Sequence, residues 1–335
     1  MEKPVVAVVG ATGAVGEEIL RCLEQRETPL GQIRLLASAR SAGKKIDFKG
    51  TPITVEEMTQ DSFAGVDIAL FSIGSGVAET FAPAATAAGA VVIDNSSAFR
   101  MDKEVPLIIP EINPEDAEQV PKRIIANPNC TTIVTLMALN PLHRLFDCQR
   151  LIASSYQAVS GSGAEGIAEL QRQVEAYVNG DPMEASIYPC QIAFNAIPQV
   201  EPIQENGYTK EEMKMQNETR KILHAAEIKA SATCVRVPVF RSHSVSVTAQ
   251  FARQPDLDAA RQAIIDASGI QLKDDREASQ YPTSLDSTNV DDCYVGRMRE
   301  DLALERSLSF WVVGDQVRKG AALNAVQIAE LLISS

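Results

Sequence analysis

Short apolar, often β-branched runs alternate with helix-like stretches over the first part of the chain. The runs that predict strands are Val5–Val9, Ile33–Ala37, Ile68–Ser72, Val91–Asp94 and Ile124–Ala126. Between them, the spacing of apolar residues over Val15–Arg26 and Ala78–Ala88 predicts helices. A repeated strand–helix alternation of this kind predicts a Rossmann-like α/β domain built on a doubly wound parallel sheet.

From about Leu151 the pattern changes, because polar and apolar positions now alternate and fewer helices separate the strands. Leu151–Val159 and Val245–Phe251 alternate as half-buried strands do. Between them lies a charged helical stretch from Lys210 to about Ala226, with Thr209 as its N-cap and Glu212 at the capping-box position. We therefore expect an α+β second domain with a mixed or antiparallel sheet that is suited to forming a dimer face.

The tail from Lys319 to Ser335 carries an apolar stripe at helical spacing, which predicts a packing helix. The stripe consists of Ala322, Ala325, Val326, Ala329, Leu332 and Ile333. We expect this helix to pack back onto the first domain. The predicted first domain is therefore residues 1–129 plus the C-terminal helix 317–335, and the predicted second domain is residues 130–316.

Composition narrows the class of protein. The chain has 335 residues, 45% of them hydrophobic and 22% charged, which is typical of a soluble protein of about two domains. No apolar run approaches the roughly 20 residues that cross a bilayer. The start, Met1-Glu-Lys-Pro4, lacks signal-peptide features, so we expect a cytoplasmic protein with no membrane partner. A net charge of −13 argues against a nucleic-acid partner.

The glycine-rich segment Gly10-Ala-Thr-Gly13-Ala-Val-Gly16 follows the first predicted strand and opens the first predicted helix. Glycines at such a turn let the backbone approach a pyrophosphate at a helix N-terminus. The pattern therefore predicts a dinucleotide site at Gly10, Thr12, Gly13, Ala14 and Val15. The alternative is a glycine-rich turn in an α/β domain that binds no cofactor.

The second predicted strand ends in Ala37-Ser-Ala-Arg-Ser41, without the acidic residue that holds a ribose 2′-hydroxyl in NAD-binding domains. Ser38, Arg40 and Ser41 offer hydroxyls and a guanidinium, which suit a 2′-phosphate. The segment therefore favours NADP over NAD as the cofactor. The alternative is a solvent-exposed basic loop.

Cys130 has a different context from the other cysteines, for which packing roles are expected. The segment Asn127-Pro-Asn-Cys-Thr-Thr132 ends one predicted strand and leads into the apolar helical run Ile133–Leu139. The dipole at a helix N-terminus favours the thiolate, which is the form of cysteine that attacks carbonyl groups. The six cysteines and three histidines show no metal-binding spacing, so no metal site is predicted.

Several segments together resemble aspartate-semialdehyde dehydrogenases. They are the glycine-rich segment, the segment around Cys130, Tyr156-Gln-Ala-Val-Ser-Gly-Ser-Gly163 and Lys319-Gly-Ala-Ala-Leu-Asn-Ala-Val-Gln327, and matching segments run from residue 5 to residue 330. The resemblance implies an NADP-dependent homodimeric enzyme that reduces β-aspartyl phosphate to aspartate semialdehyde through a thioester on Cys130. That reaction belongs to the biosynthesis of lysine, threonine, methionine and isoleucine. The first domain would then bind NADP, and the second would carry catalysis and dimerisation.

The resemblance also implies a role for each matching residue. Cys130 would be the nucleophile and His243 the general acid/base. The implied substrate-binding residues are Gln157, Arg236, Glu211 and Asn129, and the implied phosphate-binding residues are Arg100 and Lys214. Ser160, Gly161 and Gln316 would lie at the nicotinamide end of the cofactor, and relatives often carry asparagine in place of Gln316.

The residues themselves support these roles in part. Glu211 and Lys214 are three apart on a predicted helix and share one face, although a solvated ion pair is the alternative. Taken alone, His243 would be a structural histidine and Arg100 a surface residue. Two other functions remain open: another phosphorylating aldehyde dehydrogenase, such as N-acetyl-glutamyl-phosphate reductase or a glyceraldehyde-phosphate enzyme, and a non-catalytic NADP-binding regulator.

Overall fold

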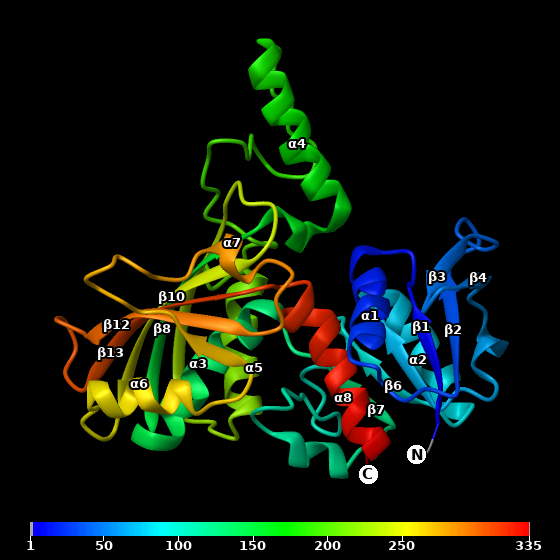
Figure 1. The fold of residues 1–335 in the computed structure, drawn as a ribbon, viewed down its shortest axis with the longest axis horizontal. Helices are drawn as coiled ribbons and strands as arrows, with labels where there is room; N and C mark the ends of the chain where they lie inside the picture. The colour runs from blue at the N-terminus through cyan, green and yellow to red at the C-terminus, as the bar shows by residue number, and fades with distance from the viewer. Residues whose placement is uncertain (1–2, 335) are drawn as a thin grey trace. The chain divides into compact units, whose positions relative to one another are not determined.

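The computed structural model describes residues 3–334, so the predictions for the first two residues of the chain and for Ser335 lie outside the described residues. The chain forms two compact units (Figure 1). One unit runs up to Asn129 and resumes at Ala321, and the other spans Cys130–Gly320. None of the helices within residues 3–334 is long and apolar enough to cross a membrane.

The first unit is built on a seven-stranded sheet with the strand order β3-β4-β2-β1-β5-β6-β7. Its strands are β1 (Val5–Val9), β2 (Gln32–Ala37), β3 (Lys45–Phe48), β4 (Thr51–Glu57), β5 (Ile68–Phe71), β6 (Val91–Asp94) and β7 (Ile124–Ala126). Its helices are α1 (Ala14–Gln25), α2 (Ser75–Ala87) and α8 (Leu323–Ser334), with short 3-10 turns η1 (Gln60–Phe63) and η2 (Pro114–Glu118). Every strand pair except β3–β4 is parallel, which confirms the predicted doubly wound sheet.

Side chains on both faces of this sheet are buried, which explains its continuous apolar strands. Val6 and Val8 of β1 lie in one core with α1 and α8, and the alternate residues Ala7 and Val9 are also fully buried. The predicted stripe of the tail lies in the same core, through Ala322, Ala325, Val326, Ala329 and Ile333. The packing of α8 is therefore part of what stabilises the first unit.

The second unit is built on a six-stranded sheet with the order β11-β12-β13-β10-β8-β9. Its strands are β8 (Cys148–Gln157), β9 (Lys229–Arg236), β10 (His243–Phe251), β11 (Ile270–Leu272), β12 (Cys293–Glu300) and β13 (Ser307–Gly314). Its helices are α3 (Cys130–Phe146), α4 (Gly163–Asn179), α5 (Lys210–Ile222), α6 (Leu257–Ile265) and α7 (Ser284–Ser287), with turns η3 (Val159–Ser162) and η4 (Arg318–Ala322). Parallel and antiparallel pairs occur together, so the sheet is mixed as predicted.

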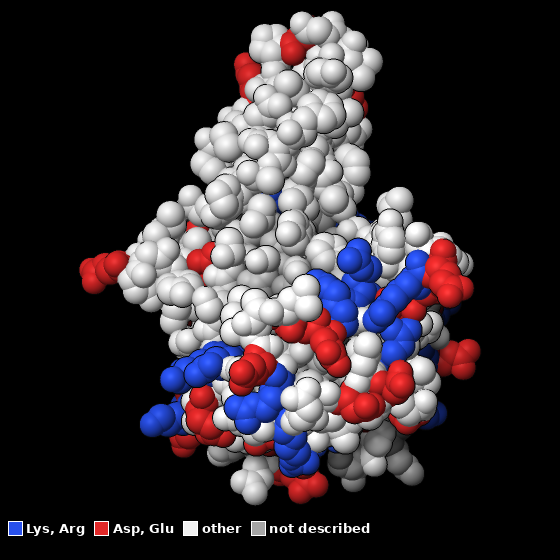
Figure 2. Space-filling model, turned by 90° about the vertical axis from the view of Figure 1, so that its left-hand side faces the viewer, with Lys and Arg blue, Asp and Glu red and all other residues white. Residues whose placement is uncertain are grey.

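One face of the second sheet is covered by α3, whose residues are mostly buried and contact four of the strands. Along β8, Leu151 and Ala153 are buried, whereas Ile152 is 48% exposed and Tyr156 39% exposed. The opposite face of β8 is therefore open to solvent in the single chain. Helix α4 projects from this unit (Figure 1), and the side of this projection seen in Figure 2 is largely free of charged side chains.

Several predicted boundaries differ from those in the structure. The predicted strand Leu151–Val159 ends at Gln157, because Ala158 turns to donate its N–H to His243. Helix α5 begins at Lys210 as predicted, but it ends at Ile222, just before His224 adopts a left-handed φ of 51°. Strand β9, which ends at Arg236, was not predicted, because its small, mixed residues give a weak sequence pattern.

Candidate active site

The glycine-rich segment forms the turn between β1 and α1. Gly10 has φ +84°, and a Cβ on it would lie 2.2 Å from the Ser72 carbonyl oxygen. A Cβ on Gly16 would lie 2.2 Å from the Gly10 carbonyl oxygen, whereas Gly13 meets nothing closer than 3.4 Å. Gly13 is the N-cap of α1 and no side chain caps it, so this helix N-terminus is accessible to an anionic group.

The loop after β2 lies beside the glycine-rich turn. The hydroxyl of Thr12 donates to the hydroxyl of Ser41 over 3.2 Å, which joins the two loops at the carboxyl edge of the parallel sheet. Ser38 and Arg40 are exposed, and Arg40 has no hydrogen bond or ion pair among residues 3–334. These donors fit the adenosine end of a dinucleotide with a 2′-phosphate.

Arg100 is only 7% exposed, so it is not a surface residue. Its Nη2 donates to the carbonyl oxygen of Asn95 over 2.8 Å, and the side chain of Asn127 donates to Asn95 Oδ1 over 3.0 Å. Asn129, also buried, follows two residues later at the end of the first unit. The segment that carries Arg100 is therefore tied to the segment that leads into Cys130.

Cys130 is the first residue of α3 and is partly exposed. A Cβ on Gly320 would lie 2.8 Å from the Cys130 Cβ, so the backbone of Gly320 lies directly against the cysteine. In contrast, burial raises the pKa values of Cys148 and Cys234 to about 12, which keeps those thiols protonated. Cys130 therefore combines access with a helix N-terminus, which a packing cysteine does not require.

Thr131 connects two of the predicted substrate-binding residues. Its hydroxyl accepts a hydrogen bond from Gln157 Nε2 over 2.9 Å and donates to Glu211 Oε1 over 3.4 Å. All three side chains are buried. The sequence places Thr131 beside the cysteine, but it does not reveal that the hydroxyl turns toward Gln157 and Glu211, so its role was not predicted.

Glu211 and Lys214 form a buried ion pair rather than a solvated one. Lys214 Nζ lies 3.1 Å from Glu211 Oε2 and 2.7 Å from Glu201 Oε1, and the side chains of Lys214 and Glu211 are 14% and 5% exposed. Burial alone would lower the pKa of Lys214, but the two carboxylates outweigh it and raise that pKa. Lys214 is therefore charged at neutral pH.

Arg236 and His243 both form hydrogen bonds with the main chain of Ala158. The Ala158 N–H donates to His243 Nδ1 over 3.1 Å, and Arg236 Nη1 donates to the Ala158 carbonyl oxygen over 2.6 Å. A Cβ on Gly161 would lie 2.7 Å from Arg236 Nη1 and 3.3 Å from His243 Cε1. A side chain at position 161 would therefore displace the Arg236 guanidinium. The contribution of Ala158 to the site was not predicted, because it comes from main-chain atoms alone.

His243 is fully buried, and its two ring nitrogens differ. Because Nδ1 accepts the Ala158 N–H, the neutral ring carries its hydrogen on Nε2. That Nε2 is buried and has no hydrogen-bond partner in the described part of the chain. Burial first, and the charge of Arg236 second, lower the pKa of His243 to about 3, while Glu211 acts in the opposite direction. A neutral ring with a buried, unmatched nitrogen is not a satisfied structural histidine.

Gln316 and Ser160 are also buried and contact each other, because Gln316 Nε2 donates to the Ser160 hydroxyl. The other end of the same amide, Gln316 Oε1, accepts the Ser242 N–H over 2.7 Å. The second unit therefore brings together the predicted residues Cys130, Gln157, Ser160, Gly161, Glu211, Lys214, Arg236, His243 and Gln316.

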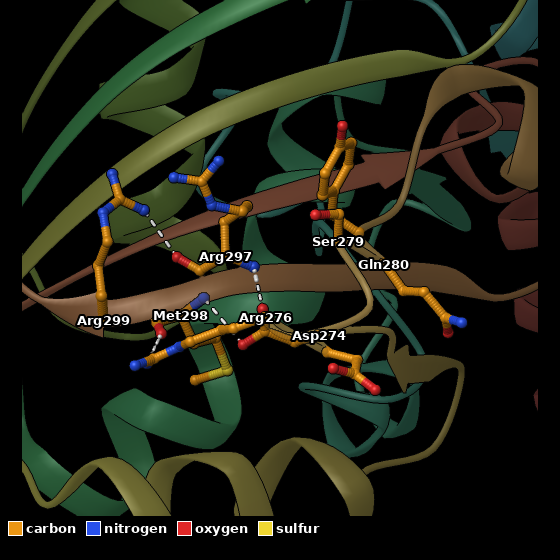
Figure 3. A pocket seen from close by; sticks show the side chains of 9 residues that line it. Asp274, Arg276, Ser279, Gln280, Arg297, Met298 and Arg299 are labelled. Carbon is orange, nitrogen blue, oxygen red and sulfur yellow. Dashed lines mark hydrogen bonds between the residues drawn. The ribbon is translucent and has the colours of Figure 1, made fainter.

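A separate pocket of the second unit contains none of the predicted residues (Figure 3). Its lining includes Asp274, Arg276, Ser279, Gln280, Arg297 and Arg299. The Asp274 carboxylate accepts the N–H groups of Arg297 and Met298 and pairs with Arg261, so it is fully occupied. The pocket holds no cysteine or histidine, and residues 3–334 contain no cluster of metal-binding side chains.

The chain is similar to known proteins over its whole length. Models of the semialdehyde dehydrogenase NAD binding domain and dimerisation domain match residues 5–120 and 139–319. The aspartate-semialdehyde dehydrogenase of Aquifex aeolicus is 48% identical over 98% of this chain and 97% of its own.

Solved structures agree with this similarity. The crystal structure of aspartate semialdehyde dehydrogenase II from Vibrio cholerae complexed with ASA has a TM-score of 0.97 and 44% identity, and covers 100% of this chain and 99% of its own. The enzyme from Candida albicans with NADP has a TM-score of 0.78 and 25% identity, over 98% of each chain.

Proposed function

This chain belongs to the aspartate-semialdehyde dehydrogenase family, and on that premise we propose that it reduces L-4-aspartyl phosphate to L-aspartate 4-semialdehyde through a thioester on Cys130. Full-length relatives support an oxidoreductase that acts on aspartate semialdehyde. The observation that carries the thioester is the position of Cys130, a partly exposed thiol at the start of α3 with Gly320 against it.

In the proposed reaction, the Cys130 thiolate attacks the acyl carbon, a C–S bond forms, the C–O bond to phosphate breaks and phosphate leaves. NADPH, when bound by the glycine-rich turn, would supply the hydride that reduces the thioester carbonyl. Collapse of the resulting hemithioacetal breaks the C–S bond and returns the thiolate to Cys130. Main-chain N–H groups at the start of α3 would stabilise the oxyanion that develops in each step.

His243 is the proposed proton donor and acceptor, and Nε2 is the atom that serves. Nδ1 is occupied by the Ala158 N–H, which leaves Nε2 as the nitrogen that can face a ligand. The ring is neutral in the chain by itself, since its pKa is lowered to about 3. An anion that binds beside it favours the protonated ring again, because opposite charges raise the pKa of a histidine. The second proton has to enter at Nδ1, so its uptake requires that the Ala158 N–H gives up its bond to Nδ1 when the anionic substrate binds.

Each charged side chain of the site is proposed to bind a different group of the substrate. Arg236, buried at the end of β9, suits the α-carboxylate because its planar fork can make two parallel hydrogen bonds. Glu211 provides a carboxylate for the α-ammonium group, and Lys214 beside it provides a positive charge for phosphate. Gln157 and Asn129 complete the proposed substrate contacts, and Arg100 is the proposed second phosphate ligand.

NADP is the proposed cofactor. The glycine-rich turn would hold the pyrophosphate through Gly10, Thr12, Gly13, Ala14 and Val15, and Ser38, Arg40 and Ser41 would hold the 2′-phosphate. Ser160, Gly161 and Gln316 would contact the nicotinamide end. A relative from Candida albicans was solved with NADP, which supports the same choice here.

We further propose that the chain is a cytoplasmic homodimer in the biosynthesis of lysine, threonine, methionine and isoleucine. The match to a dimerisation domain over residues 139–319 supports the dimer. The open face of β8, with Ile152 and Tyr156, is the proposed contact surface. The proposed division of labour is NADP binding by residues 1–129 and 317–335, and catalysis and dimerisation by residues 130–316.

The test is NADPH formation by the purified protein supplied with NADP, inorganic phosphate and L-aspartate 4-semialdehyde. We expect a signal that requires phosphate and that falls at least about 10³-fold in Cys130→Ala, because the covalent route is then lost. Cys148→Ala, which removes a buried thiol elsewhere in the same unit, is the matched control and should retain the activity.

Three other outcomes would overturn the proposal or parts of it. Near-normal turnover by Cys130→Ala would exclude the thioester. A signal without phosphate would exclude an acyl phosphate as the partner. If only N-acetyl-glutamate semialdehyde or glyceraldehyde 3-phosphate gave a signal, the chain would be a different phosphorylating aldehyde dehydrogenase.

A further inference from the structure

The side chain of Gln316 makes two hydrogen bonds that both lead to His243. Its Oε1 accepts the N–H of Ser242, the residue before the histidine, over 2.7 Å. Its Nε2 donates to the hydroxyl of Ser160, in the segment whose Ala158 N–H binds the imidazole. Gln316 is buried, so water does not compete strongly for these bonds.

The bond to Ser242 extends a β-ladder beyond its last pair. Strands β10 and β13 are antiparallel, and the ladder ends where His243 pairs with Gly314. Ser242 then leaves the strand with φ +75°, a left-handed conformation that serine rarely adopts. Its hydroxyl also lies 3.1 Å from the Thr288 hydroxyl. The Gln316 amide therefore replaces the missing main-chain partner at a strained residue next to His243.

The bond from Gln316 to Ser160 fixes the segment whose Ala158 N–H binds the imidazole. The main chain of this segment is already bound to the loop before His243, because Val159 donates to the Val239 carbonyl oxygen over 2.8 Å and Ser160 to that of Phe240 over 3.2 Å. Gln316 adds a side-chain link between the same segment and Ser242. The Ala158 N–H and the His243 backbone are thereby held relative to each other.

Gln316 is itself fixed by its neighbour. The Asp315 carboxylate is fully buried and accepts four hydrogen bonds, from Arg241 Nε and from the N–H groups of Asn289, Val317 and Arg318, at distances from 2.6 to 3.1 Å. The Asp315 carbonyl oxygen accepts the N–H of Gly320, the residue that lies against Cys130. The turn that carries Gln316 is therefore rigid and is tied to both proposed catalytic residues.

From these contacts we infer that Gln316 is a positioning residue for His243: it orients the ring through Ser242 and Ser160 and keeps its hydrogen on Nε2. This inference rests on the proposed function of His243 and adds a role to Gln316 that is independent of any cofactor contact. A side chain that only touches the nicotinamide would change cofactor affinity. A positioning residue changes the state of the histidine.

The experiment compares Gln316→Leu with the unaltered protein by NMR of the histidine ring nitrogens, without substrate. The chain has three histidines, so His143→Gln and His224→Gln suffice to assign the signals. Arg236 at the end of β9 and Glu211 on α5 are the charged groups that act on the His243 ring. We expect the unaltered protein to keep a neutral ring with hydrogen on Nε2 between pH 8 and pH 5. In Gln316→Leu we expect mixed tautomers or a titration within that range.

The same variants are then assayed. In Gln316→Leu we expect kcat to fall about 10-fold or more, because misplaced acid–base groups lose much of their contribution. We expect its dissociation constant for NADP to change by a smaller factor than kcat, since both hydrogen bonds of the side chain are internal. Thr248→Val is the matched control, because it removes a hydroxyl pair with Ser309 from the same two strands and should leave the histidine signals unchanged.

Unchanged histidine signals in a Gln316→Leu protein that binds NADP at least about 10-fold more weakly would overturn the inference, since Gln316 would then act as a cofactor contact and not as a positioning residue. If Gln316→Leu does not fold, Ser160→Ala removes one of the two bonds and should mix the tautomers to a smaller extent. Unchanged signals in Ser160→Ala would count against the inference. The NMR measurement needs no turnover, so the two proposals can fail separately. If the unaltered protein had no dehydrogenase activity but Gln316→Leu still changed the His243 signals, the proposed function would be refuted and this inference would stand.

Discussion

At the scale of single residues, Arg40 is the proposed determinant of cofactor choice. It is exposed on the loop after β2, where Ser41 is bonded to Thr12 of the glycine-rich turn. A 2′-phosphate is absent from NAD, so an arginine bound to it discriminates between the two cofactors. We expect Arg40→Ala to lower kcat/KM for NADP about 10- to 100-fold, since charge-assisted hydrogen bonds contribute about 1.5–3 kcal/mol.

The values of kcat/KM for NAD decide how that result is interpreted. They should be unchanged in Arg40→Ala, because the lost bond has no counterpart with NAD. Lys44→Ala removes the same charge from a nearby exposed position and should affect neither cofactor strongly. Equal losses with NADP and NAD would mean that Arg40 stabilises the loop and does not recognise the phosphate.

The residues that could be predicted differ physically from those that could not. Cys130 was predictable because a reactive thiol at a helix start leaves a pattern in the sequence. The contributions of Ala158 and Gly320 depend on a main-chain N–H and on a missing Cβ, and neither has a chemical signature in one sequence. Thr131 was missed because its hydroxyl acts through contacts with residues far away in the chain.

At the scale of elements, the start of α5 connects helix stability to the proposed phosphate binding. Thr209 Oγ1 accepts the Glu212 N–H over 3.2 Å and the Glu212 carboxylate accepts the Thr209 N–H over 2.7 Å. The first turns of this helix carry Glu211 and Lys214. We expect Thr209→Ala to lower the free energy of unfolding by about 1 kcal/mol and to raise KM for phosphate, because the helix start loosens.

Urea denaturation and steady-state kinetics measure the two effects separately. Thr209→Ser keeps the hydroxyl and should restore both values. Asp256→Ala removes the N-cap of α6, where Asp256 Oδ1 accepts the Ala259 N–H over 2.8 Å, and should destabilise the protein without changing KM for phosphate. If KM rose equally in both variants, general destabilisation would explain it and the link between α5 and phosphate would be rejected.

Elements with strong local signals were predicted well, and the others were not. The capping box fixed the start of α5, whereas its end depends on a left-handed His224 that no sequence pattern announces. The edge strand β3 and its neighbour β4 are largely exposed and lack the apolar runs by which the inner strands were recognised. Strand β9 pairs in parallel with β8 across a long stretch of chain, and such pairing is set by tertiary contacts.

At the scale of the whole molecule, the two sheets show how far patterning determines a fold. Apart from β3 and β4, the first sheet is parallel and buried on both faces, so each inner strand appears as an apolar run and the doubly wound arrangement follows. The strand order of the second sheet could not be derived, because alternation indicates which face is buried and not which strand is the neighbour. The same alternation does indicate which part of this sheet stays uncovered in the single chain, namely the open face of β8.

That open face supports the last prediction, which concerns assembly. Ile152 and Tyr156 are exposed on β8, and the ring of Tyr156 lies 5.4 Å from that of Trp311 on β13, so apolar groups from two strands share this face. Covering them with a second copy of the chain would bury apolar surface. We expect Ile152→Glu to weaken the dimer at least about 10-fold, because a buried, unpaired carboxylate opposes association. Sedimentation equilibrium measures the dissociation constant directly. Leu302→Glu is the matched control, since Leu302 is 104% exposed in the turn between β12 and β13, and it should leave the dimer intact. An Ile152→Glu protein that stays as tightly dimeric as this control would exclude the β8 face and place the contact elsewhere on the second unit.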